Sequence, residues 1–138
     1  MIIQQLSIFL ENKSGRLTEV TQELACKKIN ISALTVAETS DYGILRCIVS
    51  DPAQAVSALK EKGFSVGLTD VICLSIPDIP GSIANILQIL SDADISVEYM
   101  YAFSVQKKAN AIIRCEKIRD AIDILKKKNV ELLHASDI

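Results

Sequence analysis

Two short stretches of this sequence combine a glycine with polar neighbours at the start of a helical pattern. The first comprises Asn12, Lys13, Ser14, Gly15, Arg16 and Leu17, and the second, in the other half of the chain, comprises Asp78, Ile79, Pro80, Gly81, Ser82 and Ile83. A glycine has no Cβ, so backbone N–H groups beside it can approach a ligand. The N-terminus of a helix favours a negative group such as a carboxylate. The sequence therefore indicates two copies of a carboxylate-binding turn.

A free α-amino acid is a ligand that such a turn could recognise. The amides around Gly15 or Gly81 would donate to its carboxylate. The side-chain oxygen of Asn12 or the carboxylate of Asp78 would accept hydrogen bonds from its ammonium group. Simpler interpretations stay open at this point, because the glycines could serve only as turn residues and Asn12 could cap the helix or the turn. Arg16 could be a solvated side chain.

Apolar periodicity predicts the elements around the first turn. Strands are expected where apolar and polar residues alternate, and helices where apolar residues recur every three or four positions. The expected elements are a strand at Leu6–Leu10, a helix from Leu17 to Lys28, strands at Asn30–Ala37 and Ile44–Val49 joined by a hairpin turn at Ser40–Gly43, a helix starting at Asp51-Pro52 and ending at Gly63, and a short strand at Phe64–Leu68. The order is β-α-β-β-α-β.

The second half of the chain repeats this order. Its expected elements are strands at Val71–Ile76, Ile95–Tyr101, Ala111–Cys115 and Val130–Leu133, with helices on the apolar stripes of Ile83–Leu90 and Ile118–Leu125. The dipeptides Arg46-Cys47 and Arg114-Cys115 correspond if the second hairpin loop is longer by two residues.

The predicted fold is α+β, with two ferredoxin-like βαββαβ repeats whose antiparallel sheets carry helices on one face. The expected domains are residues 1–69 and 70–138, joined by the short connection Gly67–Asp70. So short a connection predicts tightly packed repeats. The many apolar residues on the open sheet faces favour a homodimer that covers them.

Composition argues against several classes of protein. The net charge of −2 and the absence of Trp provide neither the basic surface nor the stacking platforms typical of a nucleic-acid-binding protein. No apolar run approaches the ~20 residues of a membrane span. The stretch Met1–Gln5 lacks the basic region of a signal peptide. We therefore expect a cytoplasmic protein that binds neither nucleic acid nor a membrane.

Catalytic and metal-binding residues are equally scarce. The four cysteines form no C-x-x-C pair, and His134 is the single histidine. A metal site needs clustered ligands, and nucleophilic catalysis needs a nucleophile beside a base. We expect no enzyme activity, no metal and no cofactor, and we interpret the cysteines as small buried residues in a reducing compartment.

The turn motif and the helix after it resemble the ACT domain, a small regulatory module of order β-α-β-β-α-β. The resemblance rests on Asn12, Ser14-Gly15 and Ile29-Asn30-Ile31 in the first repeat, and on Asp78, Pro80-Gly81 and Ile95-Ser96-Val97 in the second. It covers nearly the whole chain, as a tandem pair without a catalytic domain. Ser14 replaces the frequent proline of the motif, and Ser96 replaces its asparagine. The second departure predicts that the two sites are not equivalent.

The resemblance implies a function as well as a fold. ACT domains bind amino acids and regulate metabolic enzymes, so it implies a free amino acid as effector and a metabolic enzyme as partner. It also implies that the second strand of a neighbouring repeat closes each site, bringing Asn30 and Ile31, or Ser96 and Val97, to the turn. Two alternatives remain. Asn30 could be a left-handed residue at a helix end, and the protein could be an interaction or oligomerisation module with vestigial ligand sites.

Overall fold

The computed structural model describes residues 1–39, 41–105 and 108–138. Ser40 of the first predicted hairpin turn and residues 106–107 of the second hairpin loop lie outside the described residues. The chain divides into two compact units, Gln4–Thr69 and Asp70–Ile138 together with Met1–Ile3. We call them the N-terminal unit and the C-terminal unit. The division into domains at 1–69 and 70–138 stays a prediction.

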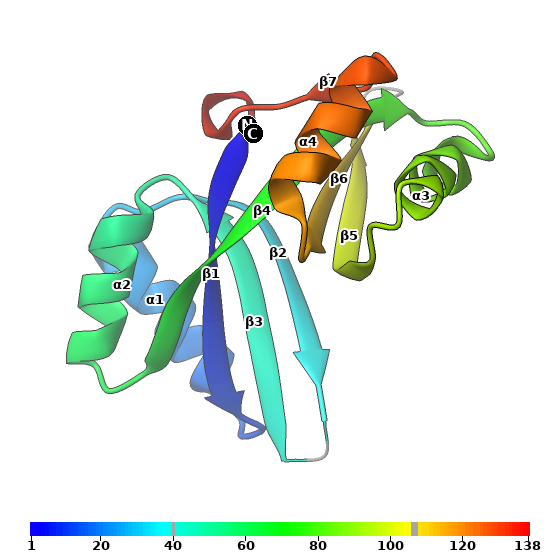
Figure 1. Cartoon of the computed structure of the whole chain (residues 1–138). Coiled ribbons are helices and arrows are strands. Elements are labelled where there is room, and N and C mark those ends of the chain that lie inside the picture. The colour runs from blue at the N-terminus through cyan, green and yellow to red at the C-terminus, as the bar shows by residue number, and fades with distance from the viewer. Residues whose placement is uncertain (40, 106–107) are drawn as a thin grey trace. The chain divides into compact units, whose positions relative to one another are not determined.

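The N-terminal unit is a four-stranded sheet with two helices. Its strands neighbour one another in the order β2-β3-β1-β4, and β1–β3 and β2–β3 are antiparallel. Helices α1 and α2 contact each other and lie on the same face of these strands (Figure 1). The elements are β1 (Ile2–Glu11), α1 (Arg16–Cys26), β2 (Ile31–Glu38), β3 (Tyr42–Val49), α2 (Pro52–Glu61) and β4 (Ser65–Pro77).

Local sequence signals account for these elements. Leu6 and Ile8 alternate toward one face of β1 and are fully buried in a cluster that includes Leu24 from α1. Helix α2 begins where Asp51 accepts a hydrogen bond from the Gln54 amide at 3.0 Å. This confirms the predicted helix start, in which Asp caps the orphan amides of the first turn.

The C-terminal unit has the same design. Its strands follow the order β7-β4-β6-β5, and each neighbouring pair is antiparallel. Helices α3 and α4 contact each other, and the core between helices and sheet includes Leu74, Leu90 and Leu125. The elements besides β4 are α3 (Ser82–Asp92), β5 (Val97–Val105), β6 (Lys108–Cys115), α4 (Ile118–Lys127), β7 (Glu131–Leu132) and the 3₁₀ turn η1 (Ala135–Asp137). The predicted pair of βαββαβ repeats is therefore confirmed.

The two units repeat with a constant offset along the chain, the one that separates Gly15 from Gly81. The helices α1 and α3, the helices α2 and α4, and the strands β3 and β6 begin and end at this same offset. The left-handed backbone positions follow it too. They are Gly15 and Gly81 with φ of 90° and 91°, Lys28 and Asp94 with 59° and 55°, and Gly63 and Asn129 with 85° and 58°.

This offset makes the predicted match between Arg46-Cys47 and Arg114-Cys115 wrong. Cys47 lies opposite Leu6 in β1, and the residue that lies opposite Ile72 in β4 is Ile113. The two strands correspond by register and burial, since Cys47 and Ile113 are both fully buried. The shared dipeptide is therefore a coincidence of composition, and the second hairpin gains no residues relative to the first.

The end of the first repeat also differs from the prediction. The sequence predicts that Gly67–Asp70 connects two strands, but these residues continue a single strand, β4, of 13 residues. The hydroxyl groups of Thr69 and Ser7 lie 3.2 Å apart, so this stretch is held beside β1. No turn signal strong enough to break the strand is present here. At the other end, the predicted closing strand Val130–Leu133 is reduced to the two residues of β7.

A pair of glycine substitutions tests how much the left-handed turn matters to stability. Nothing lies within 4 Å of a Cβ built at Gly81 or at Gly67, so a new methyl group would meet no clash at either position. Gly81 has φ of 91°, whereas Gly67 lies within a strand. Gly81→Ala should lower the free energy of unfolding by about 1–2 kcal/mol, because an L-residue is strained in the left-handed region.

Gly67→Ala is the matched control for this substitution. It should leave the free energy of unfolding unchanged or raise it by up to about 1 kcal/mol, because alanine restricts the unfolded chain. Urea unfolding of both variants provides the measurement. Equal losses of stability in the two variants would contradict the role assigned to the left-handed turn.

Candidate functional site

The first candidate site lies where β1 ends and α1 begins. Gly15 is the N-cap residue of α1, with φ of 90° and ψ of −14°. The Arg16 amide donates to the Lys13 carbonyl at 3.3 Å, and the first intrahelical bond runs from the Glu19 amide to the Gly15 carbonyl at 2.9 Å. The amides of Leu17 and the next residue precede that bond, so they have no acceptor within the helix. These amides are the donors that the turn offers to a ligand.

The turn before α3 has the same geometry. Gly81 is its N-cap residue, with φ of 91° and ψ of −14°. The Ser82 amide donates to the Ile79 carbonyl at 3.3 Å, and the Asn85 amide donates to the Gly81 carbonyl at 2.9 Å. The first-turn amide of Ile83 therefore takes the place of the Leu17 amide.

Asn12 does not occupy the N-cap position of α1. In both helices the N-cap residue is the glycine of the turn. The backbone amide of Asn12 donates to the Asp41 carbonyl at 3.0 Å, which fixes the turn to the end of the β2–β3 hairpin. The interpretation of its side chain as a cap of the turn stays a prediction.

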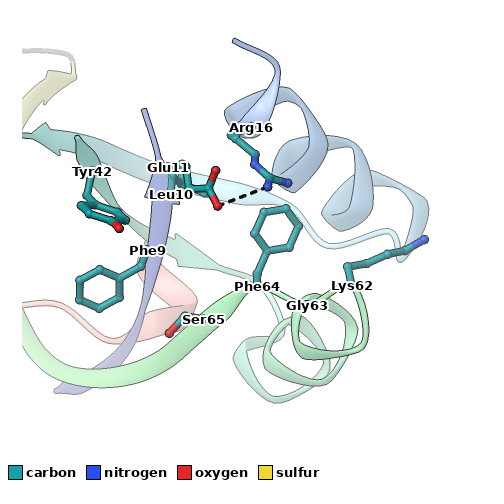
Figure 2. Close-up of a pocket in the computed structure, with 9 residues that line it drawn as sticks. All are labelled: Phe9, Leu10, Glu11, Arg16, Tyr42, Lys62, Gly63, Phe64 and Ser65. Atoms are coloured by element: carbon teal, nitrogen blue, oxygen red, sulfur yellow. Dashed lines mark ion pairs between the residues drawn. The ribbon is translucent and has the colours of Figure 1, made fainter. Parts of the chain in front are cut away.

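A hollow of about 230 Å³ adjoins the first turn. Arg16 lies over the ring of Phe64, 6.0 Å from its centroid, and points toward Glu11 (Figure 2). Its guanidinium nitrogens lie 3.7 Å from a Glu11 oxygen and 3.1 Å from a Glu19 oxygen. The lining residues are Phe9, Leu10, Glu11, Arg16, Tyr42, Lys62, Gly63, Phe64 and Ser65. Arg16 is thus a half-buried member of an ionic cluster rather than a freely solvated side chain.

The carboxylate of Glu11 is the anionic centre of this cluster. Lys13 Nζ lies 2.6 Å from its Oε2 atom. The hydrogen bond and the positive charge of Lys13, followed by the charge of Arg16, lower the pKa of Glu11 below its ordinary value. The side chain is exposed, so solvent screens these interactions.

A larger hollow of about 640 Å³ adjoins the second turn. The carboxylate of Glu131 lies at this hollow and forms an ion pair with Lys108 at 3.1 Å. Hydrogen bonds from Lys108 and then from Ser75 lower the pKa of Glu131. The lining residues are Ser75, Ile76, Pro77, Ile79, Pro80, Gly81, Ser82, Asn85, Ile86, Lys128, Asn129, Val130 and Glu131.

The second-strand residues lie away from the turn of their own unit. Ile31, at the start of β2, pairs with Val49, and the Asn30 amide donates to the Ser50 hydroxyl at 3.0 Å. The turn lies at the opposite end of β3, where Glu11 pairs with Tyr42. A single unit therefore does not bring Asn30 and Ile31 to its own glycine turn.

The C-terminal unit repeats this separation. Val97 pairs with Cys115 at one end of β6, and Pro77 pairs with Lys108 at the other. Ser96 precedes β5 at the Val97 end, so it also lies away from the turn of its unit.

The left-handed role considered for Asn30 belongs to another residue at the end of α1. Lys28 has φ of 59°, and its amide donates to the Ala25 carbonyl at 2.9 Å. Asn30 is not among the residues with positive φ in the part of the chain that the structure describes. That alternative for Asn30 is therefore wrong.

Sequence analysis missed the segments that complete the hollows. In the N-terminal unit the missing wall is Lys62–Ser65, from the end of α2 to the first residue of β4. In the C-terminal unit it is Lys128–Glu131, from the end of α4 to the first residue of β7. The left-handed residues Gly63 and Asn129 lie in these segments and could be recognised as helix ends. The sequence does not show that these two segments adjoin the glycine turns, because that placement follows from the order of the strands in the sheet.

The cysteines bear out only part of the expectation. Burial raises the pKa of Cys47 to about 12 and that of Cys73 to about 11, and it also raises the pKa of Cys115. Cys26, by contrast, is exposed on α1, because it lies off the apolar stripe that Val20 and Leu24 form.

Within the described ranges, no group of three or more potential metal-ligating side chains occurs, and no helix has the length and apolar character needed to cross a membrane.

Two βαββαβ units at a constant offset, each with a left-handed glycine turn beside a hollow, define a tandem ferredoxin-like repeat protein. A family model described as an ACT domain pair matches residues 1–138. The chain therefore belongs to the ACT domain pair family, and an ACT domain pair is a regulatory module.

Several solved structures are similar to this chain. Protein BT0572 from Bacteroides thetaiotaomicron is 53% identical over 99% of this chain and 95% of its own, with a TM-score of 0.96. The ligand-free regulatory subunit of aspartate kinase from Thermus thermophilus is 20% identical over 90% of this chain and 91% of its own, with a TM-score of 0.69. A putative C-terminal regulatory domain of aspartate kinase from Porphyromonas gingivalis W83 is 11% identical over 93% and 94%, with a TM-score of 0.56. The last two likenesses show the fold alone. A search of curated proteins finds no match.

The ionic cluster of the first turn leads to a prediction about the titration of Glu11. Lys13→Ala should raise the pKa of Glu11 toward its ordinary value, and by more than Arg16→Ala does, because Lys13 is the larger cause of the shift. NMR titration of the Glu11 side-chain carboxyl measures both effects. Since the folded-state pKa is depressed, the stability that these pairs add is present above the ordinary pKa and is lost as the pH falls through the folded value. A larger effect of Arg16→Ala would contradict the assignment.

Proposed function

We propose that this protein is an amino-acid sensor, which binds a free α-amino acid at a β1–α1-type turn and passes the signal to a metabolic enzyme. The observation that supports this proposal is the hollow beside each left-handed glycine turn. In the C-terminal unit, the turn and hollow together provide orphan amides, a carboxylate and apolar surface. These are the three kinds of surface that an amino acid requires.

The proposed contacts follow from the chemistry of the ligand. The ligand carboxylate accepts hydrogen bonds from first-turn amides such as those of Leu17 or Ile83, where the helix dipole adds a favourable field. Its ammonium donates to the side-chain oxygen of Asn12 or to the carboxylate of Asp78. Hydrogen bonds to charged groups contribute about 1.5–3 kcal/mol each, so a few of them suffice for millimolar to micromolar affinity.

A second strand from another repeat would close such a site. Asn30 and Ile31 lie at the far end of their own unit, so they can meet a glycine turn only if that turn belongs to a different repeat. We propose a homodimer as the arrangement that provides this strand. Strand β2 is an edge strand of its unit, and its side chains Leu34 and Val36 are 50% and 44% exposed. An edge with exposed apolar side chains is suited to pairing with a second copy.

The regulated partner is proposed from the solved structures. Two of the similar structures are described as regulatory parts of aspartate kinase, so we propose an enzyme of that kind as the one that this protein regulates. A bound amino acid can shift the arrangement of the units or of the dimer only by its differential affinity for the two states. A protein without an active site can thereby control a partner.

Calorimetry against the twenty amino acids tests the proposed function. At least one of them should bind at millimolar concentration or below. Asn12→Ala and Asp78→Ala test the two turns, and a variant at the turn that binds should weaken affinity by roughly tenfold, the effect of about 1.4 kcal/mol. The control Gln22→Ala replaces an exposed residue of α1 that lines neither of the two hollows.

Absence of binding by all twenty would overturn the sensor and favour the interaction module with vestigial sites. Binding that neither turn variant weakens would place the site elsewhere in the protein.

The proposed dimer has its own test. Sedimentation of the wild-type protein at micromolar concentrations should give the mass of two chains. Leu34→Asp together with Val36→Asp should shift this mass toward one chain, because the charges would be buried at the interface without partners. Glu61→Ala, an exposed change at the end of α2, is the control. A monomeric wild-type protein would contradict the proposed dimer.

A further inference from the structure

The two hollows are the same site in two versions. The residues that line the first hollow have counterparts at the repeat offset that line the second, with the exception of Tyr42. The pairs are Phe9 and Ser75, Leu10 and Ile76, Glu11 and Pro77, Arg16 and Ser82, Lys62 and Lys128, Gly63 and Asn129, Phe64 and Val130, and Ser65 and Glu131. The second hollow has five further lining residues, whose counterparts do not line the first: Ile79, Pro80, Gly81, Asn85 and Ile86. The two hollows therefore share one wall, and they differ in side chains and in how far they extend along the turn and the helix.

The hollow of the N-terminal unit already contains a side chain. The Arg16 guanidinium lies over Phe64 and points toward the Glu11 carboxylate (Figure 2). It also forms an ion pair with Glu19. A cation over an aromatic face within about 6 Å is attracted to it, and each carboxylate adds a modest, solvent-screened attraction. With 37% of its side chain exposed, Arg16 takes up space that a ligand would need. The room that remains is about 230 Å³.

The hollow of the C-terminal unit lacks that occupant. Serine replaces the arginine at position 82, proline replaces its acidic partner at position 77, and valine replaces the aromatic ring at position 130. The second hollow has a volume of about 640 Å³, and no arginine is among the residues that line it.

The rims of the two hollows also differ in polarity. The first turn carries Lys13 in the position where the second carries Ile79, and Ile79 is 65% exposed. Pro77 and Pro80 lie beside it and add further apolar surface. Glu131, the carboxylate of this hollow, is already paired with Lys108. The exposed apolar rim would gain about 25 cal/mol for each Å² that a ligand covers.

We propose that the free amino acid binds in the hollow of the C-terminal unit alone, one per chain, with an apolar side chain against Ile79 and the two prolines. Arg16 is the built-in occupant of the corresponding hollow in the N-terminal unit. This inference rests on the proposed amino-acid-sensing function, and it names the repeat that binds and the class of side chain that is bound. The tandem repeat therefore contains one receptive site and one self-occupied site.

Substitutions at the equivalent positions 82 and 16 test this inference, with affinity and stoichiometry measured by titration calorimetry. The probes are leucine, isoleucine, valine and methionine, compared with aspartate and lysine. The wild-type chain should bind one apolar amino acid per chain and bind the charged ones at least tenfold more weakly. Ser82→Arg should weaken the apolar ligand at least tenfold, because the new side chain fills the hollow. Ser91→Arg adds the same side chain to an exposed position of α3 outside the hollow and should not change affinity.

The reverse variant, Arg16→Ser, provides the complementary measurement. It empties the hollow of the N-terminal unit, so the stoichiometry for the apolar ligand should rise above one per chain. A loss of binding in this variant would overturn the inference and make Arg16 a ligand-binding residue. Two ligands per wild-type chain, or full affinity in Ser82→Arg, would overturn it as well, while leaving the amino-acid sensor intact. Absence of any amino-acid binding by the wild-type protein would instead remove the proposed function itself.

Discussion

The left-handed backbone at Gly15 and Gly81 is the constraint on which the candidate sites depend. At φ of 90° and 91° the chain leaves the end of an inner strand and enters a helix within a few residues, without a side-chain cap. A helix that starts without a side-chain cap leaves its first-turn amides available to other acceptors. Residues with side chains rarely adopt this conformation, because Cβ would approach the backbone too closely. One backbone torsion thus places the turn, the orphan amides and the adjoining hollow together in each unit.

The same backbone supports two different chemistries. The left-handed positions recur at the repeat offset, and the inner strands keep the same register. The first turn is ionic, with Glu11, Lys13 and Arg16 in contact, whereas the second is largely apolar, with Pro77 and Ile79 at corresponding positions. Buried cores tolerate few changes without loss of packing, but residues at an exposed turn can diverge with little effect on stability. A duplicated regulatory module can therefore keep its fold in both copies and change its ligand chemistry in one.

The proposed closure of each site by a second strand requires a strand from another repeat. Strand β2 starts at the end of the sheet away from the glycine turn of its own unit, so its first residues do not reach that turn. A ligand held by two repeats would have a binding free energy that depends on their arrangement, which is the physical requirement for a regulatory effect. The apolar side chains exposed at the β2 edge are consistent with the same arrangement.

The sequence by itself determined the element order, the duplication and the glycine turns, because these follow from local signals. Alternation in Leu6–Leu10, the Asp51-Pro52 helix start and the recurring Gly15 and Gly81 each depend on a few neighbouring residues. Only the tertiary structure decided the strand register and the residues that lie beside the turns, because both depend on pairing between distant segments. Strand register showed that Cys47 corresponds to Ile113, and sheet order placed Phe64 and Val130 beside the turns. The contents of the hollows were decided in the same way, since the position of Arg16 over Phe64 joins residues that lie far apart in the chain.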